Sequence, residues 1–450
     1  MADSPPLKAA SPARALLLLT LAGLAARVLL LLLEPTVGPV ADERTWTDWA
    51  KTVASARVSF SPLRTRMIFH PPLYPYFLAV PYALFGTLEA AKWVQAFFAT
   101  LLVPAVGLVG FRVFGTRVGL VAAAMCAFYP ELVWFSVHFW VENVFLVLLW
   151  WAFERLLASD ANGSKGAAVA AGLLWGLAIL ARETGLYFLP VAAAWMAWRA
   201  PRREGAAARA ALFALTALLT VAPWTYRNYV LFRAVVPVST AGGLNLFQGN
   251  ARLTRQEVYD LYEAVQGRIE QYRFGQRMGL QAIRDRQPWW IAEKLYEQMP
   301  MFWEAESMAV IHVKRGAYGP VRPPVAVAVA VVMLAPYLAV LALFVLGLAR
   351  LGWDRRALLL VLFLGYYNFI HVATHGFNRY RMPIMPIVFL LAASAFVAWR
   401  EGGLALSPRR RVVAAALALL AALVLLPSFR VHWEHPAFAL GHPGETAESP

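Results

Sequence analysis

The sequence predicts an all-α polytopic membrane protein, threaded through a bilayer by about 11–13 helices. Of its 450 residues, 60% are hydrophobic and only 15% are charged, too few charges to cover a soluble protein of this length. Runs such as 15–33, 326–349 and 412–427 are nearly free of charge and reach about the 20 residues that a membrane-spanning helix needs. A buried core helix would explain one such run, but not ten or more in one chain.

The basic residues gather in short clusters between the apolar runs. The net charge of +15 could by itself indicate nucleic acid, but this spacing is the positive-inside pattern of cytoplasmic loops. We therefore expect no nucleic-acid partner. The clusters are Lys8/Arg14, Arg112/Arg117, Arg155/Lys165, Arg199/Arg202/Arg203/Arg209, Arg350/Arg355/Arg356 and Arg409/Arg410/Arg411.

The order of apolar and polar segments predicts the domain organisation. The first apolar run is longer than a signal-peptide core and reads as a retained span, and the single cysteine, Cys126, excludes an intrachain disulfide. The predicted parts are a cytoplasmic N-terminus (1–12), an N-terminal transmembrane module (13–226) with a first outer loop (34–70), an extracytoplasmic loop domain (227–322), C-terminal transmembrane helices (323–427) and an outer tail (428–450).

The topology contains one inconsistency. Counting crossings from the first span makes the run at 138–157 end outside, whereas Arg155 and Lys165 indicate a cytoplasmic end. One run within 71–157 is therefore either two short crossings or a re-entrant segment, and the total is 11 or 13. No phosphate-binding glycine loop and no zinc-like spacing of His and Cys is present.

Polar groups near the predicted outer face are the candidates for chemistry, because charge at membrane depth is costly. Asp42 and Glu43 follow the first span and could serve as a general base or bind a divalent cation, or they could be a solvated acid pair. His70 opens the next apolar run beside two prolines. It could donate to an anionic headgroup or be only an interfacial residue.

Further candidates lie deeper in the chain. Glu131 and Glu142 flank an aromatic stretch, where either a functional or a structural role is open. Arg182 lies between two apolar runs. Arg379 and Arg381 precede the span that starts at Met382, and the guanidinium fork suits a phosphate at the outer interface.

These residues form an ordered series of motifs that resembles glycosyltransferase family 39, the relatives of dolichyl-phosphate-mannose–protein mannosyltransferases, with a GT-C fold. The resemblance runs from about residue 15 to 400. The motifs are Asp42-Glu43, His70-Pro71-Pro72-Leu73-Tyr74, Arg112-Val113-Phe114-Gly115, Ala181-Arg182-Glu183-Thr184-Gly185, Pro223-Trp224-Thr225-Tyr226-Arg227-Asn228, Gly249-Asn250 and Arg379-Tyr380-Arg381-Met382-Pro383.

The resemblance implies roles for these residues. Asp42 would be the catalytic carboxylate, acting as a base or organising a metal, with Glu43 beside it and Glu142 as a second acid. The donor phosphate would be bound by His70, Arg182, Arg379 and Arg381. Many members of the family have Lys where this chain has His70, so the charge at this position depends on pH. Tyr74, Asn250 and Tyr380 would contact the sugar or the acceptor.

The implied function is transfer of a sugar from a polyprenyl-phosphate-linked donor to a lipid, glycan or protein acceptor. The protein would be a multi-pass protein of the inner (plasma) membrane, in contact with membrane lipids, with its active site facing the periplasm or exterior. A divalent metal ion is the one cofactor left open. The alternative is a transporter or flippase of a lipid-linked saccharide. Such a protein is expected to contain internal repeats of broken helices, and no second copy of the Asp42 or His70 motif is found.

Overall fold

The computed structural model describes residues 11–34, 38–40, 42–55, 68–198, 204–352 and 354–433. Most of the predicted N-terminal segment 1–12 and of the tail 428–450 lies outside these residues. So do Arg199, Arg202 and Arg203 and a large part of the first outer loop.

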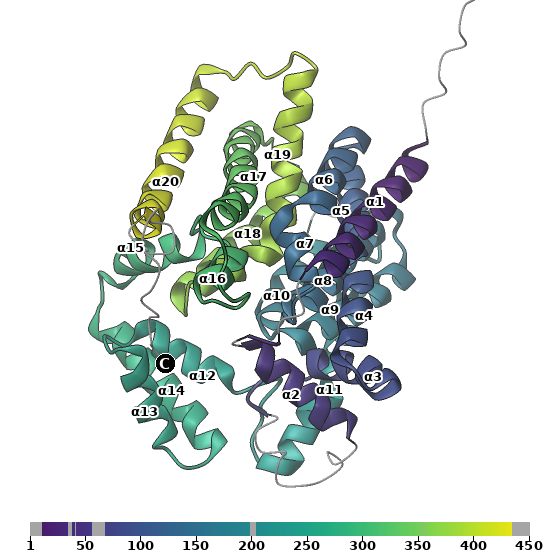
Figure 1. The fold of residues 1–450 in the computed structure, drawn as a ribbon. Helices are drawn as coiled ribbons and strands as arrows, with labels where there is room; N and C mark the ends of the chain where they lie inside the picture. The colour runs from purple at the N-terminus through teal and green to yellow at the C-terminus, as the bar shows by residue number, and fades with distance from the viewer. Residues whose placement is uncertain are drawn as a thin grey trace, which may run out of the picture.

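The described residues form helices and no strand, which confirms the all-α prediction (Figure 1). The N-terminal helices are α1 Pro12–Leu33, α2 Asp42–Ala54, α3 Leu73–Phe85, α4 Leu88–Thr100, α5 Leu102–Val113, α6 Thr116–Phe128, α7 Pro130–Ser136, α8 Glu142–Asn162, α9 Lys165–Ala181, α10 Thr184–Ala197 and α11 Ala206–Phe232. The others are α12 Ala241–Asn250, α13 Arg255–Glu263, α14 Arg268–Asp285, α15 Trp290–Phe302, α16 Met308–Lys314, α17 Pro323–Arg350, α18 Arg355–Ala373, the 3₁₀ helix η2 Asn378–Ile384, α19 Met385–Arg400 and α20 Pro408–Trp433.

One extended apolar core joins the bundle helices, with α8 and α19 at its centre. Helices α9 and α11 approach closely because small residues lie between them. A Cβ added at Gly172 would lie 2.4 Å from the carbonyl oxygen of Phe213, so only glycine fits there. Close approach at small residues is a common way for membrane helices to associate.

Six helical segments of the described residues are long and apolar enough to span a membrane, and the bent pair of α6 and α7 would make a seventh. They are Pro12–Leu33, Leu88–Val113, Ala206–Phe232, Pro323–Arg350, Arg355–Ala373 and Asn378–Arg400. The predicted 11–13 crossings therefore require shorter or more polar helices as well. Helices α9 and α10 have 17 and 14 residues, and α8 carries four acidic or basic side chains along its 21 residues.

The structure offers a solution to the inconsistent crossing count. Helix α3 has 13 residues, one fewer than α10, so its position in the molecule is more informative than its length. It packs on α2, and both lie at the end of the molecule that also carries α12–α14 (Figure 1). If α3 does not cross, the later runs alternate consistently and the lower predicted total of 11 is favoured.

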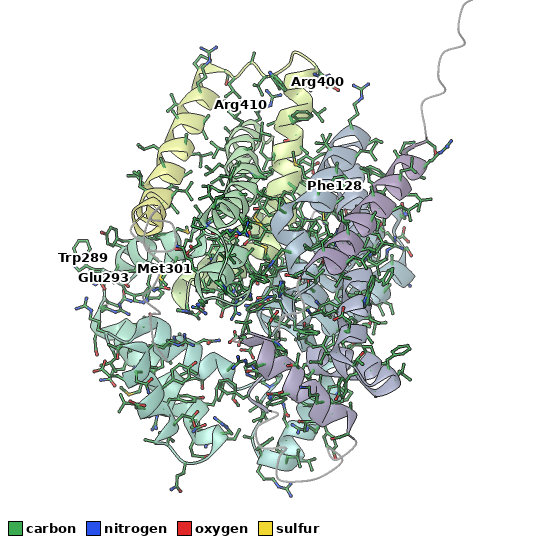
Figure 2. The ribbon with its side chains drawn as sticks, viewed as in Figure 1. Phe128, Trp289, Glu293, Met301, Arg400 and Arg410 are labelled. Carbon is green, nitrogen blue, oxygen red and sulfur yellow. The ribbon has the colours of Figure 1, made fainter. Side chains whose placement is uncertain are left out.

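The predicted basic turns meet at the opposite end of the bundle, where Figure 2 labels Arg400 and Arg410. Ion pairs connect these turns across long sequence separations: Arg112 Nη2 lies 2.8 Å from Glu154, and Arg355 Nη1 lies 2.6 Å from Asp160. Arg117 pairs with Glu401. Among the described residues, the turns near 112–117, 154–160, 355 and 401 therefore lie at one end of the bundle.

Helices α12, α13 and α14 form a helical domain with a separate small core around Leu244, Phe247, Val258 and Tyr262. Helix α12 lies directly against the chain that follows α18. A Cβ at Gly249 would overlap the carbonyl oxygen of Thr374, 1.1 Å away, and Asn250 Nδ2 donates to the carbonyl of Ala373 at 2.9 Å. The Gly-Asn pair thus anchors this helical domain to the bundle.

Candidate functional site

A cavity of about 440 Å³ lies between the bundle and the helical domain, at the end that carries α2. Segments far apart in the sequence meet there: the start of α2, the chain before α3, the α9–α10 junction, α12, α13 and η2. Its ionisable lining residues are Asp42, His70, Glu142, Arg182, Glu183, Arg255, Tyr259, Arg315, His375, Arg379 and Tyr380.

Asp42 is placed in this cavity by the start of α2. Carboxylates in the first turn favour a helix start because they face its free N–H groups, and the helix is held in place by the buried residues Trp46, Thr47 and Ala50. Arg379 Nη2 donates to Asp42 Oδ2 at 2.6 Å. Burial opposes ionisation of Asp42, but the Arg379 guanidinium overcomes it and lowers the pKa of the carboxyl below its usual value. Asp42 is therefore a carboxylate at neutral pH.

Arg379 and Tyr380 reach the cavity from η2. The Arg379 guanidinium lies over the rings of Trp140 and Tyr380, 4.7 and 5.1 Å from their centroids, and its side chain is only 15% exposed. Its Nε is buried and has no hydrogen-bond partner among the described residues. A guanidinium with unused donors in a cavity can bind an oxyanion.

A second acid–base pair lies beside the first. Helix α9 ends at Ala181, so that Arg182 is extended and turns into the cavity, where its Nη1 donates to Glu142 Oε1 at 2.5 Å. The Arg182 guanidinium also lies 4.7 Å from the Tyr380 ring centroid. Glu142 starts α8, and its Oε2 is buried without a partner among the described residues. This oxygen remains able to accept a hydrogen bond from a ligand.

His70 lines the cavity within an aromatic cluster. Its ring lies 4.9 Å from Trp46, 5.9 Å from Trp49 and 4.7 Å from Phe69, measured between centroids. Burial lowers the pKa of His70 to about 4, and nearby arginines add to this effect against the opposing effect of Asp42. His70 is therefore neutral at pH 7 and can offer a hydrogen bond rather than a charge.

Two predicted site residues point away from the cavity. Glu43 is buried on the other side of α2, where its Oε1 accepts from His138 Nδ1 at 3.0 Å and from the Phe139 N–H at 2.9 Å. Arg381 is 1% exposed, pairs with Glu131 Oε2 at 3.2 Å and lies over the Tyr337 ring. Residues at i and i+2 of a 3₁₀ helix are about 240° apart, so Arg379 and Arg381 face different surroundings.

Two further predicted contact residues, Tyr74 and Asn250, form hydrogen bonds outside the cavity lining. The Tyr74 hydroxyl donates to Gln95 Oε1 at 2.6 Å, and its ring packs edge-on against Trp46. The Asn250 amide is fully used, since its Oδ1 accepts from Trp290 Nε1 at 2.8 Å and its Nδ2 donates to backbone. Neither side chain lines the cavity.

Several lining residues were not predicted. Arg255, at the start of α13, and Arg315, just after α16, form no ion pair among the described residues. His375 lies between α18 and η2, and burial lowers its pKa to about 4. Trp140 supports Arg379. The only sequence signal for Arg255 and Arg315 was their position in the loop domain, which does not indicate a cavity.

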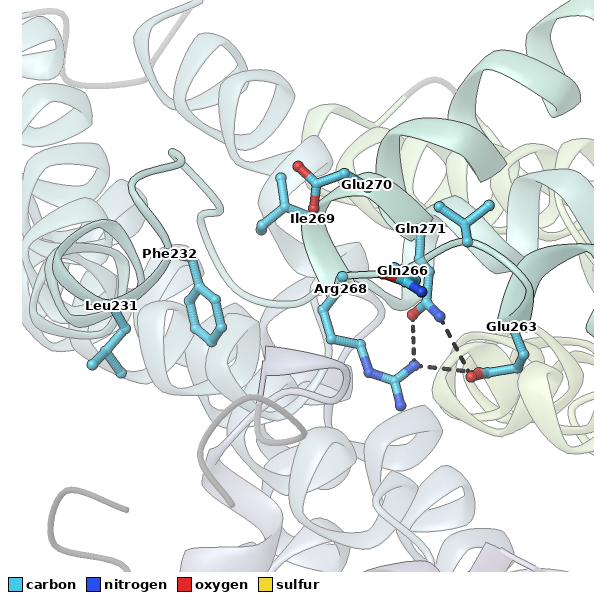
Figure 3. Close-up of a pocket in the computed structure, with 10 residues that line it drawn as sticks. Leu231, Phe232, Glu263, Gln266, Arg268, Ile269, Glu270 and Gln271 are labelled. Atoms are coloured by element: carbon cyan, nitrogen blue, oxygen red, sulfur yellow. Dashed lines mark hydrogen bonds and ion pairs between the residues drawn. The ribbon is translucent and has the colours of Figure 1, made fainter. Parts of the chain in front are cut away.

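A second hollow of about 650 Å³ lies beside the end of α11 (Figure 3). It is lined by Leu231 and Phe232 and by the chain that joins α13 to α14. Its polar groups satisfy each other, because Arg268 Nη1 donates to Glu263 at 3.3 Å and to Gln271 at 2.8 Å. The candidate site is therefore the cavity around Asp42.

The metal ion that the sequence left open at Asp42 does not fit the donors present. Within the described part of the chain, no group of three or more His, Cys, Asp or Glu side chains is placed to hold a metal ion. Asp42 Oδ2 is taken by Arg379, and the nearest other acid in sequence, Glu43, faces away. No chemical step is therefore derived through a metal.

Comparison with known proteins agrees with this architecture. Residues 69–226 match the family model described as dolichyl-phosphate-mannose-protein mannosyltransferase, which confirms the resemblance seen in the motifs. The chain has the GT-C fold. The matched segment contains His70, Glu142 and Arg182, whereas Asp42 and Arg379 lie outside it. No curated protein sequence matches the chain.

Solved structures place the GT-C fold over nearly the whole chain. The oligosaccharyltransferase AglB from Archaeoglobus fulgidus, in complex with an inhibitory peptide and a dolichol-phosphate, has a TM-score of 0.53 at 16% identity, covering 96% of this chain and 56% of that one. Its apo form gives 0.52 at 15%, covering 97% and 57%. ArnT from Cupriavidus metallidurans bound to undecaprenyl phosphate gives 0.42 at 16%, covering 88% and 79%. The present chain thus spans little more than half the length of the archaeal enzyme.

Proposed function

We propose that this chain is a membrane glycosyltransferase that moves a sugar from a polyprenyl-phosphate-linked donor to an acceptor hydroxyl. The observation that carries the proposal is the Asp42–Arg379 pair in a cavity of about 440 Å³, beside the Arg182–Glu142 pair. It joins a carboxylate able to act as a base to cations able to hold a phosphate. The matched family and the dolichol-phosphate bound to the archaeal oligosaccharyltransferase support a lipid-linked donor.

In the proposed reaction, the Asp42 carboxylate removes the proton from the acceptor hydroxyl as that oxygen attacks the anomeric carbon. The bond between this carbon and the phosphate oxygen breaks, and the polyprenyl phosphate leaves with additional negative charge. Arg379 meets this charge with its unused donors, and Arg182 adds a second guanidinium. Fixed cations aimed at a developing charge stabilise the transition state, because they need little reorganisation.

The other lining groups have supporting roles in this proposal. Glu142 Oε1 orients Arg182, and its unpartnered Oε2 accepts a hydrogen bond from a sugar hydroxyl. The Tyr380 ring lines the cavity, 4.7 Å from the Arg182 guanidinium and 5.1 Å from that of Arg379, so we assign it to the sugar position beside the phosphate. His70, neutral in its aromatic surroundings, contributes shape and one hydrogen bond. Arg381 and Glu43 act through the fold.

We further propose that the cavity opens to the periplasm or exterior of a plasma membrane. The basic turns occupy the opposite end of the bundle, and basic turns favour the cytoplasmic side. Protease accessibility of the α13–α14 segment in sealed vesicles of known orientation tests this. Cleavage only from the cytoplasmic face would contradict it.

The test of the activity uses purified protein in proteoliposomes with radiolabelled polyprenyl-phosphate sugar and an extract of envelope acceptors. Transfer of label to an acceptor is the expected result. Movement of intact donor between leaflets without transfer would instead support the transporter or flippase alternative. If folded protein neither transfers label nor moves intact donor, both the transferase proposal and the transporter or flippase alternative are refuted.

A further inference from the structure

A buried hydrogen-bonded cluster lies behind Asp42, on the side of α2 that faces away from the cavity. His138, in the chain between α7 and α8, is its centre. Its Nδ1 lies 3.0 Å from Glu43 Oε1, and its Nε2 lies 2.8 Å from Glu34 Oε1. The three side chains are 3%, 3% and 8% exposed. The Tyr318 hydroxyl donates to the same Glu34 oxygen at 3.0 Å.

With Glu34 and Glu43 both ionised, the geometry calls for a charged imidazole. A neutral ring has one N–H, and its other nitrogen would turn a lone pair toward a carboxylate. Only the imidazolium donates to Glu34 and Glu43 together. Burial opposes protonation of His138, but its hydrogen bonds to Glu34 and Glu43 raise the pKa of the ring above its usual value. Without the proton, two carboxylates would be buried with no cation between them, which is costly.

This cluster connects four segments to the start of α2. Glu43 also accepts from the Val40 N–H at 2.9 Å through Oε2 and from the Phe139 N–H at 2.9 Å through Oε1. Trp134 Nε1 donates to Tyr318 at 2.9 Å, which attaches the chain after α16. Glu43 is therefore held directly by the His138 ring and by the N–H groups of Phe139 and Val40, and Glu34 at the end of α1 is connected to it through His138.

We propose that protonated His138 is a positioning residue for Asp42, acting through Glu43. Asp42 and Glu43 are adjacent on one helix and about 100° apart, so fixing Glu43 in the core fixes the direction of Asp42 into the cavity. His138 does not line the cavity, so its effect on Asp42 is indirect. The inference rests on the proposed function for its catalytic consequence, but its structural consequence can be measured without any activity.

The test compares His138→Gln with His312→Gln in full-length protein. His312 is a matched control, because its buried ring lies 5.4 Å from that of His138 but, among the described residues, forms no hydrogen bond with Glu34 or Glu43. Hydrogen–deuterium exchange of the segment 38–50 should rise in His138→Gln and stay at the wild-type level in His312→Gln. Unchanged protection in folded His138→Gln would overturn the proposal, whatever the transfer rate.

The kinetic measurements separate positioning from general stability. In His138→Gln, kcat should fall by about 10- to 100-fold, since misplacing a reacting group by 1 Å can cost roughly 100-fold. The KM for the donor should change little, because Arg182 and Arg379 remain. Loss of α2 protection with an unchanged kcat would also overturn the proposal. If wild-type protein transfers no sugar, the proposed function fails and the exchange measurement alone decides the role of His138.

The pH profile provides a further readout. The titratable groups that face His138 are Glu34, Glu43, Tyr318 and His312. Burial, together with His138, lowers the pKa of His312 to about 4, so His312 stays neutral. Because the His138 pKa is raised, its contribution is present at low pH and is lost as pH rises through that value. The pH profile of wild-type kcat should therefore have an alkaline limb. That limb should be absent from the profile of the double variant Glu34→Gln/His138→Gln, in which one carboxylate is removed together with the imidazolium. An identical alkaline limb in that double variant would contradict a role for His138.

Discussion

Substitution of Arg379 and Arg381, two residues apart on η2, should have opposite consequences. Arg379→Gln removes an ion pair whose acid, Asp42, is 51% exposed. Such a pair contributes at most about 1 kcal/mol to stability, since solvent screens it. Arg381→Gln leaves Glu131, 2% exposed, without its cation, and breaking a buried pair in this way costs about 3–5 kcal/mol.

The expected effects on transfer are reversed. Loss of a hydrogen bond between a charged donor and a phosphate costs about 1.5–3 kcal/mol. At about 1.4 kcal/mol per tenfold change in rate, Arg379→Gln should lose about 10- to 150-fold in kcat/KM while folding normally. Arg381→Gln should be poorly folded, with near-normal turnover in the fraction that folds.

The assay measures thermal unfolding and labelled-sugar transfer on the same detergent-purified samples, normalised to folded protein. A well-folded Arg381→Gln that has lost transfer would refute the assignment of Arg381 to the fold. So would an Arg379→Gln variant that unfolds as readily as Arg381→Gln.

The remaining predictions concern pH and packing. Because the Asp42 pKa is lowered, kcat/KM should persist as pH falls below neutrality and decline only as pH passes through that lowered value. In Arg379→Gln the decline should begin at higher pH. An acidic limb at the same pH as in wild type would contradict the pairing of Asp42 with Arg379. Since the His70 pKa is about 4, His70→Gln should show the same pH profile as wild type between about pH 6 and 8. Tyr74→Phe should lower thermal stability by about 1–3 kcal/mol, because it leaves Gln95 Oε1 unsatisfied, with transfer per folded molecule unchanged.

The sequence predicted the helical class, the basic end of the bundle and the identity of the cavity groups Asp42, His70, Glu142, Arg182 and Arg379. Apolar length and charge clustering are local properties, so they can be read without a structure. The direction of each side chain cannot. Arg381 shares the motif of Arg379, but η2 turns it toward Glu131, and a 3₁₀ turn was not evident from the residues.

Helix ends and junctions depend on similar local details. The apolar run predicted at 71–87 forms α3, which Gly86 ends after 13 residues in the left-handed conformation. The Gly249-Asn250 pair suggested a ligand contact, whereas its small size and amide serve the junction with the chain after α18. Arg255 and Arg315 reach the cavity through packing of the helical domain, which the sequence alone does not specify.

The central claim is that Asp42 acts as the base while Arg379 holds the leaving phosphate. The most direct measurement is single-turnover transfer from radiolabelled polyprenyl-phosphate sugar by wild type and Asp42→Asn, with donor binding measured on the same preparations. Asn is isosteric with Asp and leaves the cavity filled. The account predicts that Asp42→Asn binds donor but transfers no detectable sugar. Transfer at the wild-type rate by Asp42→Asn would contradict it.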